Sequence, residues 1–177
     1  MIVRRGCELS SEFVSRLRAN EPSAWEEFYD STAGDLRAFV ARLGSRNPDD
    51  TLGEVMVQVV RDIGRFRGAD SELRPWTFGI ARNRVIDEGR RRSRRPQEVE
   101  SDPSADFPAP MEESLDLGTV SALLDQLTVE QREVVWLRHG VGFSLVETAE
   151  IVGKDPEAVA ALSYRGLRRL RRLLSGS

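Results

Sequence analysis

The segment from Phe143 to Arg172 constrains the fold of this chain more than any other stretch. Ser144 and Glu147 have the spacing of a capping box, in which a hydroxyl and a carboxylate each bond a free backbone N–H at a helix start. Gly153 can then end that helix by taking a positive φ, and Asp155-Pro156 supplies the N-cap and first-turn proline of a second helix. The segment therefore predicts a helix-turn-helix whose second helix is rich in arginine.

The faces of this second helix can be assigned from the sequence. Ala149 is small enough for two helices to cross closely, and Val159 is apolar where the second helix must face the first. At about 3.6 residues per turn, Gly166 and Leu170 share the inner face with Val159. The outer face then carries Glu157, Ala161, Tyr164, Arg165 and Arg168. In a DNA-binding motif the first three would meet base edges and the two arginines phosphates. The alternative is a packed helical hairpin with a solvated basic face.

Charge is distributed in a way that favours local contacts with nucleic acid. The 177 residues have a net charge of −3, so the chain as a whole is not basic. Seven arginines nevertheless lie between Arg82 and Arg95, and five more between Arg165 and Arg172. Every basic residue except Lys154 is arginine. Arginine suits bidentate phosphate contacts, although a GC-rich genome would give the same bias.

The sequence gives no support for an enzyme, a metal site or a cofactor. Cys7 is the only cysteine and His139 the only histidine, so no internal disulfide and no Cys/His zinc site can form. Paired carboxylates such as Asp49-Asp50 lack an accompanying histidine or glycine-rich phosphate loop. No apolar run approaches the roughly 20 residues of a membrane helix, and the N-terminus lacks the apolar stretch of a secretory signal. We expect a cytoplasmic protein without a membrane segment.

Apolar residues recur at helical spacing from Leu9 to Ile63, which predicts helices throughout the first part of the chain. Ser23 and Glu26 have the spacing of another capping box. The helix from Asp49 to Ile63 places Leu52, Val55, Val59 and Ile63 inward and polar residues on the other side. The polar, glycine-containing stretch from Arg65 to Arg74 predicts a loop, and a further helix is expected from Pro75.

A boundary follows the arginine run. Residues 96–114 hold four prolines and six acidic residues but almost no large apolar ones, which predicts a flexible acidic linker. Beyond it, leucines and valines at helical spacing and the capping box Thr128 with Gln131 predict two helices that support the helix-turn-helix. The fold class is therefore all-α, with two small helical domains, residues 1–95 and 115–177.

The helix from Pro75 to Asp87 combines an aromatic residue, an amide and arginines, and it continues into the run Arg90 to Arg95. On charge alone that run would be a solvated helix end. Together with the polar loop before it, it offers hydrogen bonds and phosphate neutralisation of the kind that binding an opened DNA strand requires. Within this helix, Trp76 is expected in the core rather than as a stacking platform.

With both halves described, nearly the whole chain resembles the bacterial sigma factors of the extracytoplasmic-function (ECF) group, which keep only regions two and four of the sigma-70 family. Residues 74–87, with the arginines after them, look like the region-two pattern of Trp, Ile-Ala-x-Asn, then Asp and basic residues. Residues 127–170 are similar to region four, with its Gln-Arg-Glu-Val and Ser-x-x-Glu-x-Ala segments.

The resemblance implies a role for each set of residues. The helix from Asp49 to Ile63 would bind the clamp of core RNA polymerase through Asp50, Glu54, Gln58 and Arg61. The loop before Pro75 would capture a base flipped from the minus-ten element of promoter DNA, and the helix after it would track the opened strand. These minus-ten residues are Arg67, Asp70, Ser71, Arg74, Asn83, Arg84, Asp87, Arg90 and Arg91. The second helix of the helix-turn-helix would bind the minus-thirty-five element through the outer-face residues named above.

The resemblance also implies an anti-sigma factor as a partner, and it has two departures. Gly53 stands where the family usually has glutamine, and glycine there costs a helix about 1 kcal/mol relative to alanine. Ala160, Ala161 and Leu162 replace residues that many members use at the minus-thirty-five element. The main expectation is a non-catalytic factor that binds core polymerase and directs promoter recognition and melting. The alternative is a helix-turn-helix regulator that acts on duplex DNA without polymerase.

Overall fold

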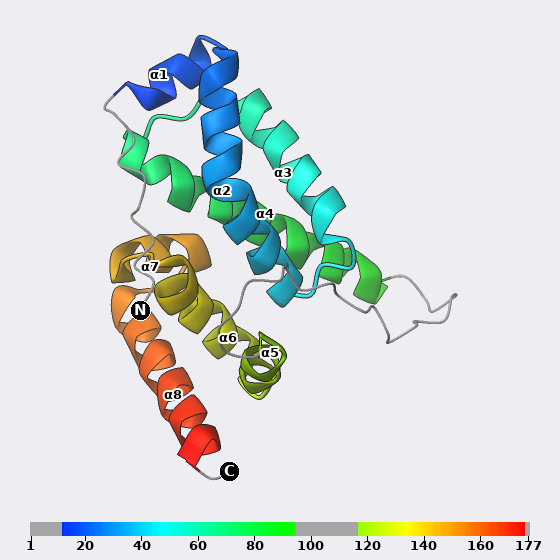
Figure 1. Ribbon diagram of the computed structural model, residues 1–177, viewed down its shortest axis with the longest axis vertical. Helices are drawn as coiled ribbons and strands as arrows, with labels where there is room; N and C mark the ends of the chain where they lie inside the picture. The colour runs from blue at the N-terminus through cyan, green and yellow to red at the C-terminus, as the bar shows by residue number, and fades with distance from the viewer. Residues whose placement is uncertain (1–11, 95–116, 176–177) are drawn as a thin grey trace.

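The computed structural model describes residues 12–94 and 117–175, and the regular secondary structure within these ranges is helical (Figure 1). The first range holds α1 (Phe13–Arg18), α2 (Pro22–Arg42), α3 (Pro48–Asp62) and α4 (Asp70–Arg94). The second holds α5 (Leu117–Asp125), α6 (Val129–Val135), the π-helical segment η1 (Trp136–Val141), α7 (Leu145–Val152) and α8 (Pro156–Ser175). The predicted all-α class is confirmed. Leu9, Arg95 and the predicted linker, residues 96–114, lie outside the described residues.

Capping explains where several helices begin. The Ser144 hydroxyl accepts the Glu147 N–H at 3.2 Å, and the Glu147 carboxylate accepts the Ser144 N–H at 2.7 Å. Thr128 and Gln131 form the same reciprocal pair at the start of α6. Two of the three predicted capping boxes are therefore confirmed. Each joins the two ends of a first turn and fixes the helix start to one residue.

The third capping box, Ser23 with Glu26, was predicted wrongly. α2 begins two residues earlier than that box requires, with Pro22 as its first residue and Glu21 as its N-cap, and no side chain caps it. Proline suits the first helical position, because its φ is already helical and its missing N–H would have no partner there. Ser23 instead accepts a hydrogen bond from Arg16 Nη2 at 3.3 Å.

The predicted loop from Arg65 to Arg74 is also too long, because α4 starts at Asp70 rather than at Pro75. The Glu72 carboxylate accepts the Ala69 N–H at 2.6 Å, which satisfies a free donor at the helix start. Leu73 is fully buried and holds this added turn against the core. Packing therefore extends the helix past the position that the proline alone would indicate.

The first four helices enclose a core of aromatic and branched side chains. The residues predicted to face inward from α3 are buried, and Trp76 packs partly buried against Phe66, with ring centroids 4.9 Å apart. The largest fully buried side chains of these helices are Phe13, Leu17, Phe28, Leu36, Phe39, Val40, Val55, Val59, Leu73 and Phe78. α4 crosses beneath α2 and α3 and contacts both (Figure 1).

The second group of helices packs directly onto the first. α7 lies against α4, and α6 and η1 contact α2. Phe78 of α4 meets Phe143, which precedes α7, edge to face at a centroid distance of 4.9 Å. Most of the buried apolar residues of the two groups consequently form one continuous cluster, and Leu124, Leu127 and Val135 form a second, smaller one. The sequence patterns did not predict this contact.

A buried ion pair lies in the same contact. Arg82 Nε of α4 donates to Glu133 Oε1 of α6 at 2.5 Å, and the two side chains are only 19% and 5% exposed. Burial raises the pKa of Glu133, and the hydrogen bond and charge of Arg82 offset only part of that effect. Removing one partner of such a pair leaves an uncompensated buried charge, so the pair joins the two groups of helices firmly.

The π-helical turn of η1 directs a third contact across the interface. It holds Trp136 so that the Arg42 guanidinium of α2 lies 3.6 Å from the centroid of the Trp136 ring. A Cβ on Gly140 would come within 2.7 Å of that ring, so only glycine fits this turn unless Trp136 moves. We call the set of side chains that meet across the two groups the junction: Arg42, Arg74, Phe78, Arg82, Glu133, Trp136 and Phe143.

Two glycine substitutions should have opposite effects on stability. A Cβ on Gly53 meets nothing within 4 Å, so Gly53→Ala should raise the free energy of unfolding by about 1 kcal/mol, the difference in helix propensity. A Cβ on Gly166 would lie 2.7 Å from Val135 Cγ2. Overpacking should outweigh the propensity gain there, and Gly166→Ala should lose about 1 kcal/mol net. Urea unfolding of both variants measures this, and a gain for Gly166→Ala would contradict it.

The raised pKa of Glu133 predicts how stability depends on pH. A carboxyl with a higher pKa in the folded state keeps its proton longer there, so the folded chain loses stability as pH rises from the ordinary value of 4.5 through the raised pKa. Glu133→Gln removes this pH-dependent contribution to the free energy of unfolding while keeping an acceptor for Arg82. The unfolding free energy of the wild type minus that of the variant should therefore fall with rising pH and then level off. A difference that grows with pH would show that the ion pair outweighs burial.

Candidate nucleic-acid interface

The residues predicted to bind polymerase share one surface groove on α3. Asp50, Glu54, Gln58 and Arg61 line it together with Gly53, Val57 and Arg84. Gly53 lacks a side chain at this face, which leaves the groove open along the helix. The neighbouring Asp49 is held by Arg37 through two hydrogen bonds of 2.6 and 2.9 Å, which lower the pKa of Asp49. Of the paired carboxylates, only Asp50 belongs to the predicted contact set.

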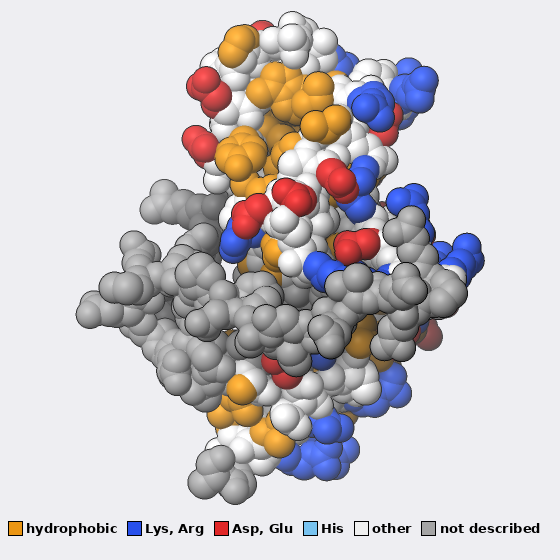
Figure 2. All heavy atoms as spheres, turned by 90° about the vertical axis from the view of Figure 1, so that its right-hand side faces the viewer, with side chains coloured by type: hydrophobic (Ala, Val, Ile, Leu, Met, Phe, Trp, Pro, Cys, Tyr) orange, Lys and Arg blue, Asp and Glu red, His pale blue; other side chains and the backbone are white. Residues whose placement is uncertain are grey.

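Exposed apolar side chains extend this surface. Val57 and Val60 of α3 are 57% and 50% exposed, and Tyr29 of α2 is 50% exposed. Figure 2 shows a group of apolar side chains on the upper part of this face, with acidic and basic side chains beside it. Apolar anchors within a polar rim are typical of a surface that binds another protein.

Arg84 connects this groove with the predicted DNA-binding helix. Its Nη1 donates to Glu54 at 2.5 Å and its Nη2 to Gln58 at 3.3 Å, so α4 and α3 are bonded at their polar faces. The Arg84 and Glu54 side chains are 35% and 59% exposed. A pair with this exposure contributes about 0–1 kcal/mol, so either partner can exchange it for another group at little cost.

The loop and first turn of α4 contain the predicted base-contacting residues, and the structure divides them into two kinds. Arg67 and Ser71 are exposed, with Arg67 Nη1 donating to the backbone oxygens of Gly64 and Phe66. Arg74 is half-buried and forms an ion pair with Asp35 of α2 at 2.5 Å. Arg67 and Ser71 thus face solvent, whereas Arg74 is held by the protein.

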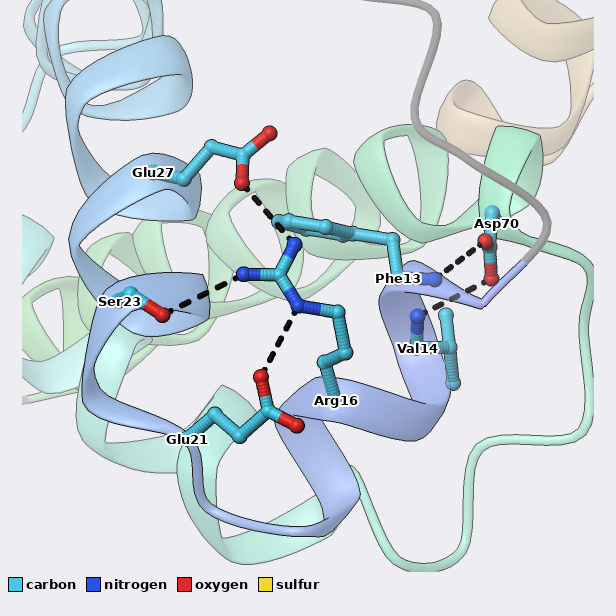
Figure 3. A network of polar contacts seen from close by, with 7 residues as sticks. All are labelled: Phe13, Val14, Arg16, Glu21, Ser23, Glu27 and Asp70. Carbon is cyan, nitrogen blue, oxygen red and sulfur yellow. Dashed lines mark hydrogen bonds and ion pairs between the residues drawn. The ribbon is translucent and has the colours of Figure 1, made fainter.

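Asp70 is also engaged by the protein itself. Its two carboxylate oxygens accept the N–H groups of Phe13 and Val14 at 2.7 and 3.1 Å, at the start of α1 (Figure 3). The residue before α1, Glu12, makes no side-chain cap, so Asp70, the first residue of α4, replaces a local cap. A contact between Asp70 and DNA stays a prediction, and it would require these bonds to break.

The second half of α4 presents the predicted strand-tracking residues to solvent. Asn83, Asp87, Arg90 and Arg91 are all exposed. Arg90 pairs loosely with Asp87, with 3.6 Å between Nη1 and Oδ1. Because these cations are exposed and only weakly bonded, they can transfer to phosphates without loss of a strong internal contact.

The helix-turn-helix is formed as predicted. Gly153 ends α7 with φ of +66°, and α8 begins at Pro156. Val159 is fully buried, and Ala149 is 5% exposed at the crossing of the two helices. All the residues predicted for the outer face are exposed, namely Glu157, Ala161, Tyr164, Arg165 and Arg168. Lys154 in the turn bonds Glu130 of α6 at 2.7 Å, which fixes the turn to the supporting helix.

No metal-binding group forms among the described side chains. Within residues 12–94 and 117–175, no group of three or more His, Cys, Asp or Glu side chains could hold a metal ion. His139 is exposed, although its ring is partly desolvated, and Nε2 lies 3.1 Å from Ser163 Oγ. This desolvation and, to a lesser extent, the charge of Arg138 lower the pKa of His139. No helix in the described ranges is long and apolar enough to cross a membrane.

Sequence patterns missed the junction. The sequence patterns assign no contact to Trp136 or Phe143, and they place Arg82 only in the basic run. One signal was available, because Gly140 and Gly142 are flanked by aromatic residues. The structure has a π-helical turn here, and such turns often lie at functional sites.

Comparison with known proteins agrees with this geometry. The family model of Sigma-70 region 2 matches residues 28–95, and that of Sigma-70 region 4 matches residues 117–170. The first match covers most of α2 through α4, with the groove and the strand-tracking face, and the second covers α5 to most of α8. The residues of all three predicted sites therefore lie within matched regions.

Similar proteins include the ECF RNA polymerase sigma factors BldN of Streptomyces coelicolor and ShbA of Streptomyces griseus. The chain is 33% identical to BldN in an alignment of 172 residues that covers 92% of this chain and 65% of BldN, a little under two thirds of that protein. It is 31% identical to ShbA in an alignment of 150 residues that covers 79% of this chain and 74% of ShbA.

Two solved structures share the fold. RpoE from Bartonella quintana, solved in complex with the anti-sigma factor NepR, superimposes with a TM-score of 0.69 and 26% identity over 85% of this chain and 96% of RpoE. CnrH, solved in complex with the cytosolic domain of CnrY, gives a TM-score of 0.70 and 21% identity over 96% of this chain and 99% of CnrH. With regions 2 and 4 matched over most of its length and relatives of this identity, the chain belongs to the ECF group of the sigma-70 family of RNA polymerase sigma factors.

Proposed function

We propose that this chain binds core RNA polymerase, directs it to promoters and helps to melt them, without catalysing a reaction itself. One observation carries the proposal: a single chain exposes both an arginine-rich helix end on α4 and a helix-turn-helix formed by α7 and α8. A regulator of duplex DNA needs only the second. The sequence similarity to ECF sigma factors through both regions supports the same role.

The groove on α3 is the proposed polymerase site. Asp50, Glu54, Gln58 and Arg61 would supply its polar contacts, and Val57 and Val60 would supply the apolar area that drives association. The bond from Arg84 to Glu54 is exposed and weak enough for a polymerase side chain to replace it.

The minus-ten element would be bound in two steps along α4. The loop with Arg67 and Ser71 would receive a flipped base, which costs a few kcal/mol of stacking. Asn83, Asp87, Arg90 and Arg91 would then follow the opened strand, joined by Arg74, Arg84 and Asp70 once these give up their internal partners. In this proposal α4 favours promoter opening because it binds one separated strand more tightly than it binds the duplex.

The minus-thirty-five element would be bound by α8. Glu157, Ala161 and Tyr164 lie where base edges would be, and Arg165 and Arg168 lie where phosphates would be. An alanine can touch a thymine methyl but cannot hydrogen-bond a base. We therefore propose that this helix selects its element only moderately and that selectivity comes from the two elements together.

Two further assignments follow from the family. RpoE, whose structure was solved with an anti-sigma factor, is similar enough to suggest an anti-sigma factor as a partner here. The site of action would be the cytoplasm, where core polymerase and the chromosome are.

The test is transcription by purified components. The chain is added to core polymerase and a library of promoter fragments, and run-off transcripts are sequenced. The proposal expects start sites that appear only when the chain and the polymerase are both present, downstream of a shared pair of elements. Binding to duplex DNA with no polymerase-dependent transcript would instead support the duplex regulator.

Replacing Arg90 and Arg91 should separate promoter opening from polymerase binding. Arg90→Ala with Arg91→Ala removes two exposed cations of α4 that do not line the groove on α3, so affinity for core polymerase should be unchanged. For binding of the holoenzyme to a single-stranded minus-ten oligonucleotide, the logarithm of the binding constant falls linearly with the logarithm of the salt concentration, with a slope of about 0.7 for each phosphate contact. Because the variant loses two contacts, the slope should become shallower by about 1.4.

A matched control for this test removes two exposed arginines that belong to none of the proposed contact sets, Arg46→Ala with Arg169→Ala. That variant should keep the wild-type slope and affinity. Equal loss of polymerase and oligonucleotide binding in the Arg90 and Arg91 variant would contradict the assignment.

A further inference from the structure

We propose that Glu157 is the residue that determines base specificity at the minus-thirty-five element, and that it selects a cytosine. The proposal deepens the proposed function and rests on it, because it names the base that α8 would bind. Three observations carry it: the position of Glu157 on α8, the lack of a partner for its carboxylate within the described residues, and the chemistry of the side chains beside it.

Glu157 lies on the side of α8 that faces away from the protein. Val159, two residues later, is fully buried. At about 3.6 residues per turn, a residue two positions from Val159 points about 160° away from it, so Glu157 and Ala161 both lie opposite the buried face. Tyr164 lies on the same side and is 65% exposed. We call Glu157, Ala161 and Tyr164 the base-facing side of α8.

The Glu157 carboxylate is available for a base, unlike other glutamates around the helix-turn-helix. Glu130 accepts from Lys154 at 2.7 Å, and Glu147 accepts the Ser144 N–H at 2.7 Å. Among the residues that the structure describes, none donates a hydrogen bond to the Glu157 side chain or forms an ion pair with it. Binding to a base therefore costs this carboxylate no internal contact.

A carboxylate at this place discriminates among the four bases, because an ionised carboxylate only accepts hydrogen bonds. In the major groove cytosine presents only its N4 amino donor, guanine presents two acceptors, and thymine presents an acceptor and a methyl group. Adenine presents a donor and an acceptor. Glu157 therefore binds cytosine best and adenine less well, and it binds guanine and thymine least.

The other two side chains of the base-facing side do not supply this discrimination. The Ala161 methyl group makes only apolar contacts, such as one with the thymine methyl. The Tyr164 hydroxyl both donates and accepts, so it matches either kind of group on a base edge. Glu157 is thus the member of the base-facing side whose hydrogen bonding distinguishes one base from another.

Spacing along α8 predicts where a second preference lies. Glu157 and Ala161 are four residues apart, which is about 6 Å along the helix at about 1.5 Å per residue. Base pairs are stacked about 3.4 Å apart, so the two residues span at most about two base-pair steps. A thymine that contacts Ala161 should therefore lie within about two base pairs of the cytosine that contacts Glu157.

The experiment uses the full-length chain, core polymerase and promoter fragments whose minus-thirty-five segment is randomised. Fragments bound by the chain, with and without polymerase, are sequenced, and the base preference is calculated at each position. Wild type should prefer cytosine at one position by at least about fivefold over guanine or thymine, the lower end of the effect of one mismatched base pair. Adenine should lie between them.

Glu157→Gln should move this preference from cytosine to adenine. Glutamine has a donor and an acceptor, and it can bond N6 and N7 of adenine together. It has nearly the helix propensity of glutamate, and residue 157 is exposed, so the variant should fold. Glu157→Ala should leave no preference at this position. In both variants the preferences at all other positions should be unchanged.

Asp155→Asn is the matched control, because it removes the same charge at the same helix start. The Asp155 carbonyl accepts the Val159 N–H at 3.1 Å, which makes Asp155 the N-cap residue of α8. Asparagine caps a helix as well as aspartate does. Loss of this negative charge should raise affinity for all fragments together, and the base preferences should stay those of wild type.

An unchanged cytosine preference in Glu157→Gln overturns the proposal, and so does a wild type that shows no cytosine preference. A shift to adenine in Asp155→Asn as well would also overturn it, because the effect would then come from charge in general. Circular dichroism of each variant checks that its helix content equals that of wild type.

Run-off transcription from the same fragments keeps the two proposals apart. If transcripts require both polymerase and the chain, but Glu157→Gln selects the same fragments as wild type, the assignment of Glu157 is wrong and the proposed function stands. If Glu157→Gln shifts the base preference in binding, but neither protein gives a transcript with polymerase, the assignment is right and the proposed function is wrong.

Discussion

Placement of α4 is the constraint on which the rest of the structure depends. This one helix contacts α1, α2 and α3 on one side and α7 on the other. Its buried residues, among them Leu73, Phe78, Ala81 and Val85, leave only part of its surface for DNA. Every proposed site therefore takes its position from α4: the loop precedes it, the α3 groove borders it through Arg84, and the second group of helices docks on it.

Much of the fold follows from local rules in the sequence. Helix starts at Ser144 and Thr128, the left-handed Gly153 and the buried Val159 all depend on neighbours within a few residues, and all were predictable. The outer face of α8 was predictable for the same reason. Where local rules competed, as between a helix that starts with Pro22 and one capped by Ser23, the two possible starts lay two residues apart and local sequence did not choose between them.

Contacts between distant residues were not predictable. Arg82 and Glu133 are 51 positions apart, and each belongs to a segment with a sufficient local explanation, the arginine run and the capped α6. A buried ion pair produces no periodic pattern in the sequence, whereas a buried apolar helix face does. Likewise the exposed face of α4 was predictable, whereas the engagement of Arg74 by Asp35 and Phe143 required the tertiary structure.

The cap that Asp70 provides to α1 has a consequence for the neighbouring loop. The loop from Arg65 to Ala69 has no regular pattern of its own, and its far end is fixed because Asp70 holds the Phe13 and Val14 N–H groups (Figure 3). Its near end is fixed by Arg18 of α1, which donates to the Ile63 and Phe66 carbonyls. The conformation of the loop assigned to a flipped base thus depends on α1, a helix of only six residues. If loop sequences were exchanged between related chains, the new loop would bring its own side chains, but it would keep its original conformation only if α1 were exchanged with it.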